Sequence, residues 1–115
     1  DKASHYLDPD GMEWEKSQFP GIDIKVLYSD PTTGMFTALF RLAPGAIVPL
    51  HEHTAIEQTY VIAGSLEDHE GKCGPGQFVW RPAGNRHIAH APNGCVMLCT
   101  FLKPNRFAEG QKFFR

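Results

Sequence analysis

Long hydrophobic runs are absent from this chain of 115 residues. No apolar stretch approaches the roughly 20 residues that a membrane-spanning helix requires, so we expect no membrane partner. The first residues also lack the charged and apolar pattern of a secretory signal, although the sequence begins at Asp1 rather than at a methionine. We therefore expect neither insertion into a membrane nor secretion.

Clusters of basic residues are lacking as well. The 11 Lys and Arg residues are scattered along the chain, and the formal net charge is -2. Surfaces that bind nucleic acids usually carry a basic patch or stripe, so we expect no nucleic-acid partner. With 21% charged residues, the chain also differs in composition from an extended disordered tail.

Cysteine is scarce, with only Cys73, Cys95 and Cys99 in the chain. Their spacing contains no CxxC pair of the kind that holds zinc or performs redox chemistry. An odd number of cysteines without an obvious pairing suits a reducing compartment better than an oxidising one. We therefore expect a cytoplasmic protein in which Cys95 and Cys99 pack in the core as small hydrophobic residues.

Long helices are not expected, because nine prolines and eleven glycines punctuate the chain at short intervals. The best helix signal, in residues 9–18, contains two breakers and is compatible with a single turn. Between the breakers lie short runs rich in Val, Ile, Phe, Thr and Tyr, and such runs separated by turn residues predict an all-β sandwich or barrel. The expected strands are residues 22–28, 35–42, 57–62, 76–81, 87–90 and 95–102.

The size and composition of the chain suit a single domain. A chain of 115 residues with 42% hydrophobic residues is long enough to build one core, and it contains no internal repeat. We expect one domain over residues 1–115, with an N-terminal arm over residues 1–20 and a C-terminal extension over residues 103–115.

A group of histidines is the most informative feature that the sequence does contain. His51 and His53 are separated by one residue, so on a β-strand both side chains project to the same side. Glu57 follows after three residues that allow a tight turn, which brings its carboxylate back beside the two imidazoles. His87, after the loop of residues 82–84, supplies a third imidazole from another part of the barrel.

Three imidazoles and one carboxylate suit a divalent first-row metal ion. A pair of surface histidines is a common chance occurrence, and Glu57 by itself is compatible with a solvated strand residue. The combined spacing of the four residues with several glycines is much harder to obtain by chance. The predicted metal ligands are therefore His51, His53, Glu57 and His87.

The same residues resemble two motifs of the cupin superfamily. Residues 45–64 match the first motif, G(X)5HXH(X)3-4E(X)6G, at every fixed position. Residues 76–87 match the second motif, G(X)5PXG(X)2H(X)3N, up to its histidine. The departure is Ala91, where the pattern has an asparagine that is not a ligand in the family. The linker of residues 65–75 is short, as is typical of small bacterial cupins.

The resemblance implies an antiparallel jelly-roll barrel of about six to eight strands. It also implies that the four predicted ligands bind one divalent metal ion inside the barrel, and that the protein forms a homodimer through sheet edges and terminal strands. At a finer level, residues 22–42 are similar to the cupin domain of certain zinc-binding anti-sigma factors. They are also similar to small cupins related to β-diketone (acetylacetone-cleaving) and dihydroxyacetophenone dioxygenases, some of which use three histidines without a carboxylate.

Two functions from different classes fit these residues. The first is a non-haem iron dioxygenase that acts on a small diketone, phenolic ketone or similar chelating compound. Fe(II) is favoured because histidine-rich sites with open positions suit it, while Zn, Ni or Mn fit the same ligands. An isomerase or a decarboxylase would use the same residues. The second function is a zinc-binding small-molecule or redox sensor or binding module of the anti-sigma type. The presence of Glu57 moves the chain somewhat away from the dioxygenases that use three histidines without a carboxylate.

The alternation of side chains along the expected strands assigns further residues. Thr59 and Val61 share the side of Glu57 and are expected to line the cavity, whereas Tyr60 points away from it. His90 lies three residues after His87, so it faces the opposite side of its strand. We therefore expect His90 at the surface or behind the ligands rather than among them.

The remaining polar residues have less specific assignments. The polar segment of residues 67–72, which contains His69, is expected to be a solvated hairpin. In residues 76–81, alternation separates Phe78 and Trp80 from Val79 and Arg81, and either face can be the inner one. Three arginines are candidates for binding a substrate carboxylate or enolate, although each is more often a surface residue. They are Arg41, Arg81 and Arg86.

Overall fold

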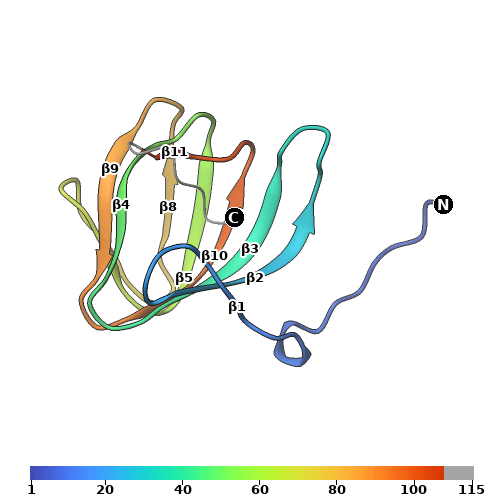
Figure 1. Ribbon diagram of the computed structural model, residues 1–115, viewed down its shortest axis with the longest axis horizontal. Helices are drawn as coiled ribbons and strands as arrows, with labels where there is room; N and C mark the ends of the chain where they lie inside the picture. The colour runs from blue at the N-terminus through green and yellow to red at the C-terminus, as the bar shows by residue number, and fades with distance from the viewer. Residues whose placement is uncertain (108–115) are drawn as a thin grey trace.

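Two antiparallel sheets face each other and enclose the core (Figure 1). The computed structural model describes residues 1–107, and residues 108–115 of the expected C-terminal extension lie outside the described residues. The six-stranded sheet has the order β1 (Glu15–Lys16), β2 (Ile22–Ser29), β3 (Phe36–Leu42), β10 (Cys95–Phe101), β5 (Glu57–Gly64) and β8 (Phe78–Arg81). The five-stranded sheet has the order β11 (Arg106–Phe107), β4 (Ala46–Glu52), β9 (Arg86–Ala91), β6 (Leu66–Glu67) and β7 (Lys72–Cys73).

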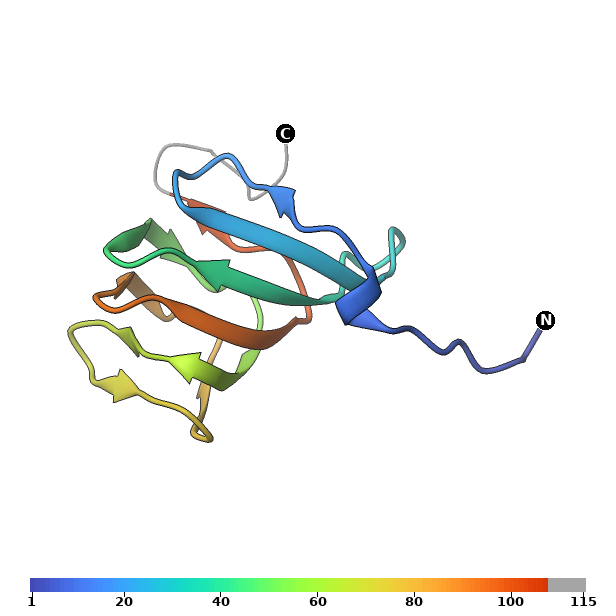
Figure 2. The ribbon, with the colours of Figure 1, turned by 90° about the horizontal axis from the view of Figure 1, so that it is seen from below.

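This architecture confirms the predicted all-β jelly roll, and each strand expected from the sequence is present. The helix signal in residues 9–18 forms only one short turn, the 3-10 helix η1 (Pro9–Gly11), which the Asp8 side chain caps by accepting the amide of Asp10. Within residues 1–107, no helix has the length and apolar character needed to cross a bilayer. The segment before η1 runs away from both sheets (Figure 1 and Figure 2).

The later part of the expected N-terminal arm is attached to the six-stranded sheet. β1 pairs with β2, and the Lys25 ammonium group donates a hydrogen bond of 2.6 Å to the carbonyl of Pro9. The same ammonium group and the Arg41 guanidinium group each lie 4.5 Å from the centroid of the Trp14 ring. Such cation–π contacts hold the arm against the outer face of this sheet.

The core lies between the two sheets, because side chains along β5 and β10 alternate between a buried inner face and an outer face. In β5, Thr59 and Val61 face inward with Glu57 and are buried, as expected, whereas Tyr60 is exposed. In β10, every second residue from Cys95 to Phe101 is buried, which confirms that Cys95 and Cys99 belong to the core. Each buried side chain of this kind contributes roughly 1.5–3 kcal/mol through removal of apolar surface from water.

An irregularity in β4 determines where its histidine points. Val48 pairs with Ala89, whereas His51 pairs with His87, so β4 carries one more residue than β9 between these two pairs. A bulge of this kind shifts the inward positions by one residue. Val48 and His51 are therefore both buried, although one has an even and the other an odd number.

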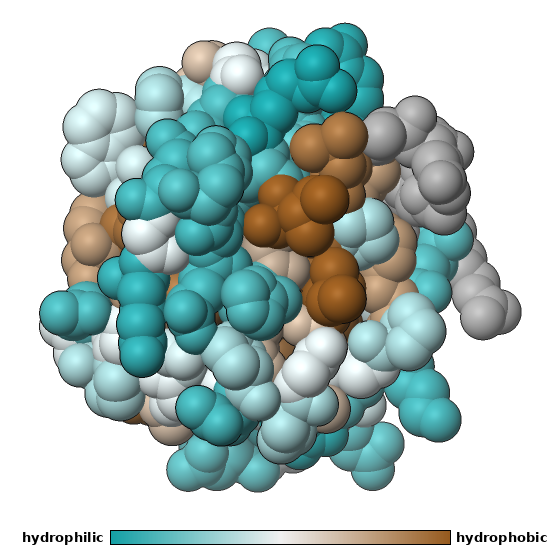
Figure 3. Space-filling model, turned by 90° about the vertical axis from the view of Figure 1, so that its left-hand side faces the viewer, coloured by the Kyte–Doolittle hydropathy of each residue, from teal (hydrophilic) through white to brown (hydrophobic). Residues whose placement is uncertain are grey.

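Hydrophobic side chains remain exposed on the outer faces of both sheets. Phe78 and Trp80 of β8 are 55% and 58% exposed, so the inner face of that strand carries Arg81. In the five-stranded sheet, Ile47 and Ile88 are more than half exposed. The space-filling view of that side shows hydrophobic atoms beside a largely hydrophilic surface (Figure 3). The expected homodimer stays a prediction.

Two glycines of the first motif have left-handed backbone conformations but different surroundings. Gly64 has a φ of +71°, and a Cβ atom there would overlap the carbonyl oxygen of Gly94 and lie 2.9 Å from the Cα atom of Cys95. Gly45 has a φ of +83°, and no atom lies within 4 Å of the position that its Cβ would take. Both positions favour glycine, but only Gly64 also lacks the space for a side chain.

We expect the Gly64→Ala variant to be far less stable than the Gly45→Ala variant. The left-handed conformation alone costs an alanine about 1–2 kcal/mol, which is the loss expected at Gly45. At Gly64 the overlap with backbone atoms adds to this strain, and the free energy of unfolding should fall by about 4 kcal/mol or more. Urea unfolding of both variants beside the unsubstituted protein measures the difference, and equal losses would contradict the steric argument.

Candidate metal centre

Two of the predicted ligands face each other across neighbouring strands. His51 of β4 and His87 of β9 are paired residues in the five-stranded sheet, and the centroids of their rings lie 4.4 Å apart. Both side chains point into the barrel, where they are 4% and 3% exposed. The bulge in β4 thus brings these two imidazoles together directly.

The third histidine lies just beyond the end of β4 and is held by its backbone. The amide of His53 donates to the carbonyl of Asn85 at 2.8 Å, and the amide of Gly84 donates to the carbonyl of His53 at 2.7 Å. These bonds join the loop after β4 to the loop before β9, which are the loops of the two motifs. His53 is completely buried as a result, so three histidines from two motifs meet in one place.

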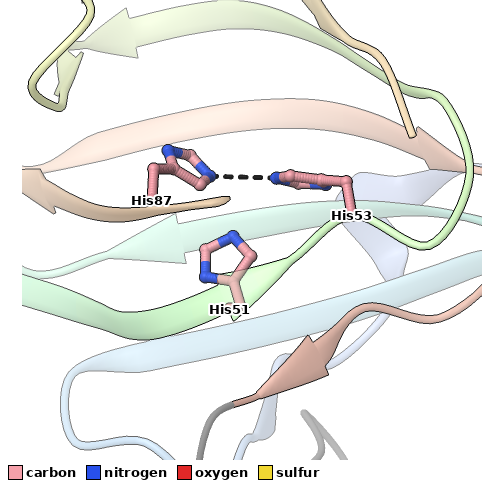
Figure 4. A group of neighbouring side chains, drawn as sticks. All are labelled: His51, His53 and His87. Atoms are coloured by element: carbon pink, nitrogen blue, oxygen red, sulfur yellow. Dashed lines mark hydrogen bonds between the residues drawn. The ribbon is translucent and has the colours of Figure 1, made fainter. Parts of the chain in front are cut away.

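The three imidazoles converge on one point (Figure 4). One ring nitrogen of each histidine lies within 4.8 Å of the others, and the Nε2 atoms of His53 and His87 are 2.9 Å apart. Two nitrogen atoms that bind one ion at about 2.1 Å along perpendicular directions lie about 3 Å apart, so this separation suits a shared ion.

Hydrogen bonds at the outer nitrogen atoms determine which ring nitrogen keeps its lone pair. Nδ1 of His51 lies 2.7 Å from the carbonyl oxygen of Pro49, and Nδ1 of His87 lies 2.6 Å from a carboxylate oxygen of Asp68. Both oxygens only accept, so each Nδ1 carries the proton and donates it. The Nε2 atom of each of these two rings therefore has a free lone pair.

A neutral His53 ring cannot satisfy both of its neighbours. Its Nδ1 atom lies 3.0 Å from Glu57 Oε1 but is not aligned with it as a hydrogen bond, and its Nε2 atom faces Nε2 of His87. A proton on Nε2 leaves the Nδ1 lone pair against a carboxylate, whereas a proton on Nδ1 leaves two lone pairs 2.9 Å apart. A cation between the Nε2 atoms removes this conflict, so the residues present fit a bound metal ion.

Glu57 lies beside His53, next to Nδ1 rather than next to the Nε2 atom that faces His87. Its Oε1 atom is the one near His53 Nδ1, and its Oε2 atom accepts a hydrogen bond of 2.5 Å from the hydroxyl group of Thr59. The sulfur atom of Cys99 lies 3.3 Å from the same hydroxyl oxygen. The structure thus brings Glu57 into the site, while direct binding of a metal by its carboxylate stays a prediction.

Asp68 was not anticipated from the sequence. It follows β6 in the segment expected to be a solvated hairpin, yet its side chain is only 3% exposed. Its Oδ2 atom accepts a hydrogen bond from Nδ1 of His87 and forms an ion pair of 2.8 Å with the guanidinium group of Arg81. The expectation of a solvated segment is therefore wrong for Asp68, whereas the neighbouring His69 is exposed. An acidic residue in a polar turn looks the same in a sequence whether it faces solvent or the interior.

The three candidate arginines lie in different surroundings. Arg81 is buried beside Asp68, whereas Arg41 forms an ion pair of 2.8 Å with Asp23 on the outer face of the six-stranded sheet. Arg86 is exposed, and it lines the same cleft as His51. Of the three, Arg86 is thus placed to meet a ligand that approaches this cleft. His90 is exposed, as expected.

Two spaces of very different size adjoin the histidines. The cavity inside the barrel, lined in part by His51, Glu57 and His87, has a volume of about 20 Å³, which suits a water molecule rather than an organic compound. A cleft of about 320 Å³ reaches His51 from outside, and Arg86 and Arg106 are among its lining residues. This cleft has the size to receive a small organic molecule.

Burial favours the neutral forms of His51 and His87. Burial lowers the pKa of His51 to about 4, from an ordinary value of 6.5, against the opposing effect of the Pro49 carbonyl. Burial also lowers the pKa of His87, and the nearby Arg81 charge adds to this effect. Burial alone would raise the pKa of Glu57, but the adjoining His53 imidazole and the Thr59 hydroxyl group hold it below its ordinary value.

The sequence matches one known family over most of its length. The model of the family described as the ChrR cupin-like domain matches residues 2–106. Among curated proteins, none matches the chain significantly.

Solved structures share the fold. An acetylacetone dioxygenase from Acinetobacter johnsonii has a TM-score of 0.85 and 22% identity, over 97% of this chain and 84% of that chain. A chain in the complex of SigE with the anti-sigma ChrR from Rhodobacter sphaeroides has a TM-score of 0.71 and 21% identity, over 80% of this chain and 50% of that chain. The polyketide cyclase RemF from Streptomyces resistomycificus has a TM-score of 0.73 and 20% identity, over 92% and 86%. At these identities the likeness establishes the fold alone.

The metal-free protein should lose stability as the pH falls from 6.5 towards 4. The folded chain resists protonation of His51 until about pH 4, whereas the unfolded chain takes up this proton near pH 6.5. The unfolded state therefore binds more protons in this window, and the loss from His51 should reach on the order of 3 kcal/mol. The lowered pKa values of His87, Glu57 and Asp68 act in the same direction.

Urea unfolding of the metal-free protein at pH 7, 6 and 5 measures this dependence. The His51→Phe variant should show a shallower slope because it lacks the group that titrates. The His90→Phe variant changes an exposed histidine and serves as the matched control, with the slope of the unsubstituted protein. Equal stability at pH 7 and pH 5 would contradict the electrostatic argument.

Proposed function

We propose that this chain, which belongs to the family of ChrR cupin-like domains, is a metal-dependent cupin that acts as a non-haem iron dioxygenase. The substrate class that we propose is a small diketone, phenolic ketone or similar chelating compound. His51, His53 and His87 would hold one divalent metal ion, with Fe(II) favoured. The observation that carries the proposal is the convergence of three buried ring nitrogens in a place where a cation is required.

The position of Glu57 supports the oxygenase over a closed metal site. Its two oxygen atoms already contact His53 and Thr59, which leaves three histidines as the group that faces the convergence point. Three ligands on one side of an iron ion keep positions open for substrate and O2. The fold shared with an acetylacetone dioxygenase is in keeping with this reading.

The protein's own residues would bind and orient the substrate. A bound iron ion supplies Lewis acidity and redox chemistry at the site. The cleft beside His51 places the exposed guanidinium group of Arg86 where it can pair with an anionic enolate oxygen. The interior cavity of about 20 Å³ is too small for an organic molecule, so such a ligand would reach the site from this cleft.

A zinc-binding sensor or binding module is the second candidate function. It is favoured by the interior cavity of about 20 Å³, which leaves no room for an organic molecule beside His87 and Glu57. In that case the three histidines and Glu57 would form a closed set of four ligands, which is typical of structural zinc sites. The ChrR chain in the complex with SigE has the same fold.

The first test is elemental analysis of protein purified without added metal, followed by O2 uptake with Fe(II). The substrates are a panel of β-diketones and phenolic ketones. We expect iron-dependent uptake that falls by at least about 100-fold in the His51→Ala variant, since the ion loses one of three nitrogen ligands. The exposed His90 provides the matched control, and His90→Ala should retain the activity. Tightly held zinc without turnover would contradict the oxygenase and favour the sensor.

A second prediction concerns Glu57. If its carboxylate acts by orienting His53, the Glu57→Ala variant should bind Co2+ about 10–100-fold more weakly than the unsubstituted protein. This loss should be smaller than that of His51→Ala, which removes a ligand. Glu15→Ala is the matched control, because Glu15 is exposed in β1, an edge strand of the six-stranded sheet that carries none of the three histidines. A loss as large as that of His51→Ala would show that Glu57 binds the metal directly.

A further inference from the structure

A line of buried contacts links His87 to two charged side chains from other elements. Nδ1 of His87 in β9 donates to Oδ2 of Asp68, and this oxygen also forms an ion pair with Arg81 at the end of β8. The distances are 2.6 Å and 2.8 Å, and the side chains of Asp68 and Arg81 are 3% and 9% exposed. The line therefore connects a strand of each sheet through the turn after β6.

The carboxylate of Asp68 is held at both of its oxygen atoms. Oδ1 accepts from the backbone amides of Glu70 at 2.8 Å and Gly71 at 3.1 Å, while Oδ2 accepts from His87 and forms an ion pair with Arg81. Three hydrogen bonds and one ion pair hold this carboxylate against the ring. An acceptor fixed in this way selects the tautomer of His87 that carries its proton on Nδ1.

The same pair separates the metal centre from a second open space. A cleft of about 540 Å³ lies along β8 and the turn between β6 and β7, and Asp68 and Arg81 are both among its lining residues. Arg81 also lines the interior cavity together with His87. The ion pair of Asp68 and Arg81 therefore lies between the cleft and the histidines. The two opposite charges compensate each other there, and His87 stays buried.

We propose that Asp68 is a positioning residue of the metal centre, held in place by Arg81, and that it keeps the Nε2 lone pair of His87 directed at the metal. The proposal rests on the proposed metal binding. A positioning role and a purely structural role of Asp68 predict different results when Asp68 is substituted. Only the positioning role predicts a change in the tautomer of His87.

The Asp68→Asn variant separates these two roles. The amide has the shape of the carboxylate, and its oxygen takes the place of Oδ1 to accept the two backbone amides. Its NH2 group then replaces Oδ2 and faces Nδ1 of His87. A donor at this place requires a lone pair on Nδ1, so the proton of the ring moves to Nε2 and blocks the nitrogen that would bind metal.

Two measurements on labelled protein test the proposal. Long-range 1H–15N spectra of the metal-free protein report which nitrogen of His87 carries the proton, and Co2+ titration by visible absorption reports affinity. We expect the Nδ1–H tautomer in the unsubstituted protein and the Nε2–H tautomer in Asp68→Asn, with Co2+ bound about 10–100-fold more weakly. Asp68→Glu, which keeps the carboxylate, should restore part of the affinity.

The matched control is Asp23→Asn. Asp23 forms an ion pair with Arg41 at the same distance of 2.8 Å, but on the outer face and away from the histidines. This variant should keep the His87 tautomer and bind Co2+ within about twofold of the unsubstituted protein. If Asp68→Asn does not fold, the Asp68→Glu variant is used for the test. Its longer side chain should keep the Nδ1–H tautomer of His87 but hold the ring less precisely, so this variant should bind Co2+ less tightly than the unsubstituted protein.

The outcomes separate this proposal from the proposed function. A folded Asp68→Asn protein with an unchanged His87 tautomer, or with unchanged Co2+ affinity, would overturn the positioning role. An unsubstituted protein that binds neither Co2+ nor Fe(II) would overturn the proposed function instead, while its spectra would still show which nitrogen of His87 carries the proton.

Discussion

The Nε2 lone pairs of His51 and His87 and the ring of His53 meet at one buried point, and this is the constraint on which the site depends. A buried polar atom without a partner costs free energy, and two lone pairs in contact repel each other. The carbonyl oxygen of Pro49 accepts a hydrogen bond from Nδ1 of His51, and the carboxylate of Asp68 accepts one from Nδ1 of His87. With an acceptor outside, each of these rings presents its lone pair inside. The arrangement is therefore balanced only when a positive charge occupies the centre.

The barrel meets this constraint mainly through its backbone. His51 and His87 face each other because β4 and β9 are neighbouring strands, and His53 is held by hydrogen bonds between its own peptide groups and the loop of Gly84 and Asn85. The side chains therefore have little freedom to rearrange once the sheets have formed. This explains why the same fold can keep a precise ligand geometry while the residues lining the surrounding clefts differ from one protein to another.

Much of this arrangement could be predicted from the sequence, because the residues concerned follow simple periods. Thr59 and Val61 lie two and four residues after Glu57, so alternation along the strand places all three on the inner face. The spacing of the histidines identifies the site. In β8 the alternation separates the two faces but does not tell which one is inner, and Phe78 and Trp80 lie outside although they are more apolar than the opposite face. There the buried residue is the charged Arg81, which only its ion pair with Asp68 makes tolerable. An ion pair between residues that are distant in the sequence, such as Asp68 and Arg81, has no local sequence pattern from which it could be predicted.

The bulge in β4 means that the metal centre depends on the pairing of two strands rather than on an unbroken alternation along one of them. Residues 49 and 50 are only partly buried, and together they lie opposite the single residue 88 of β9. Removing one of them would make the pairing regular, and Val48 and His51 would then lie two residues apart and both still face the interior. The site therefore tolerates a change of length by one residue before His51, whereas the same change between His51 and His53 would turn one of these two imidazoles away from the other.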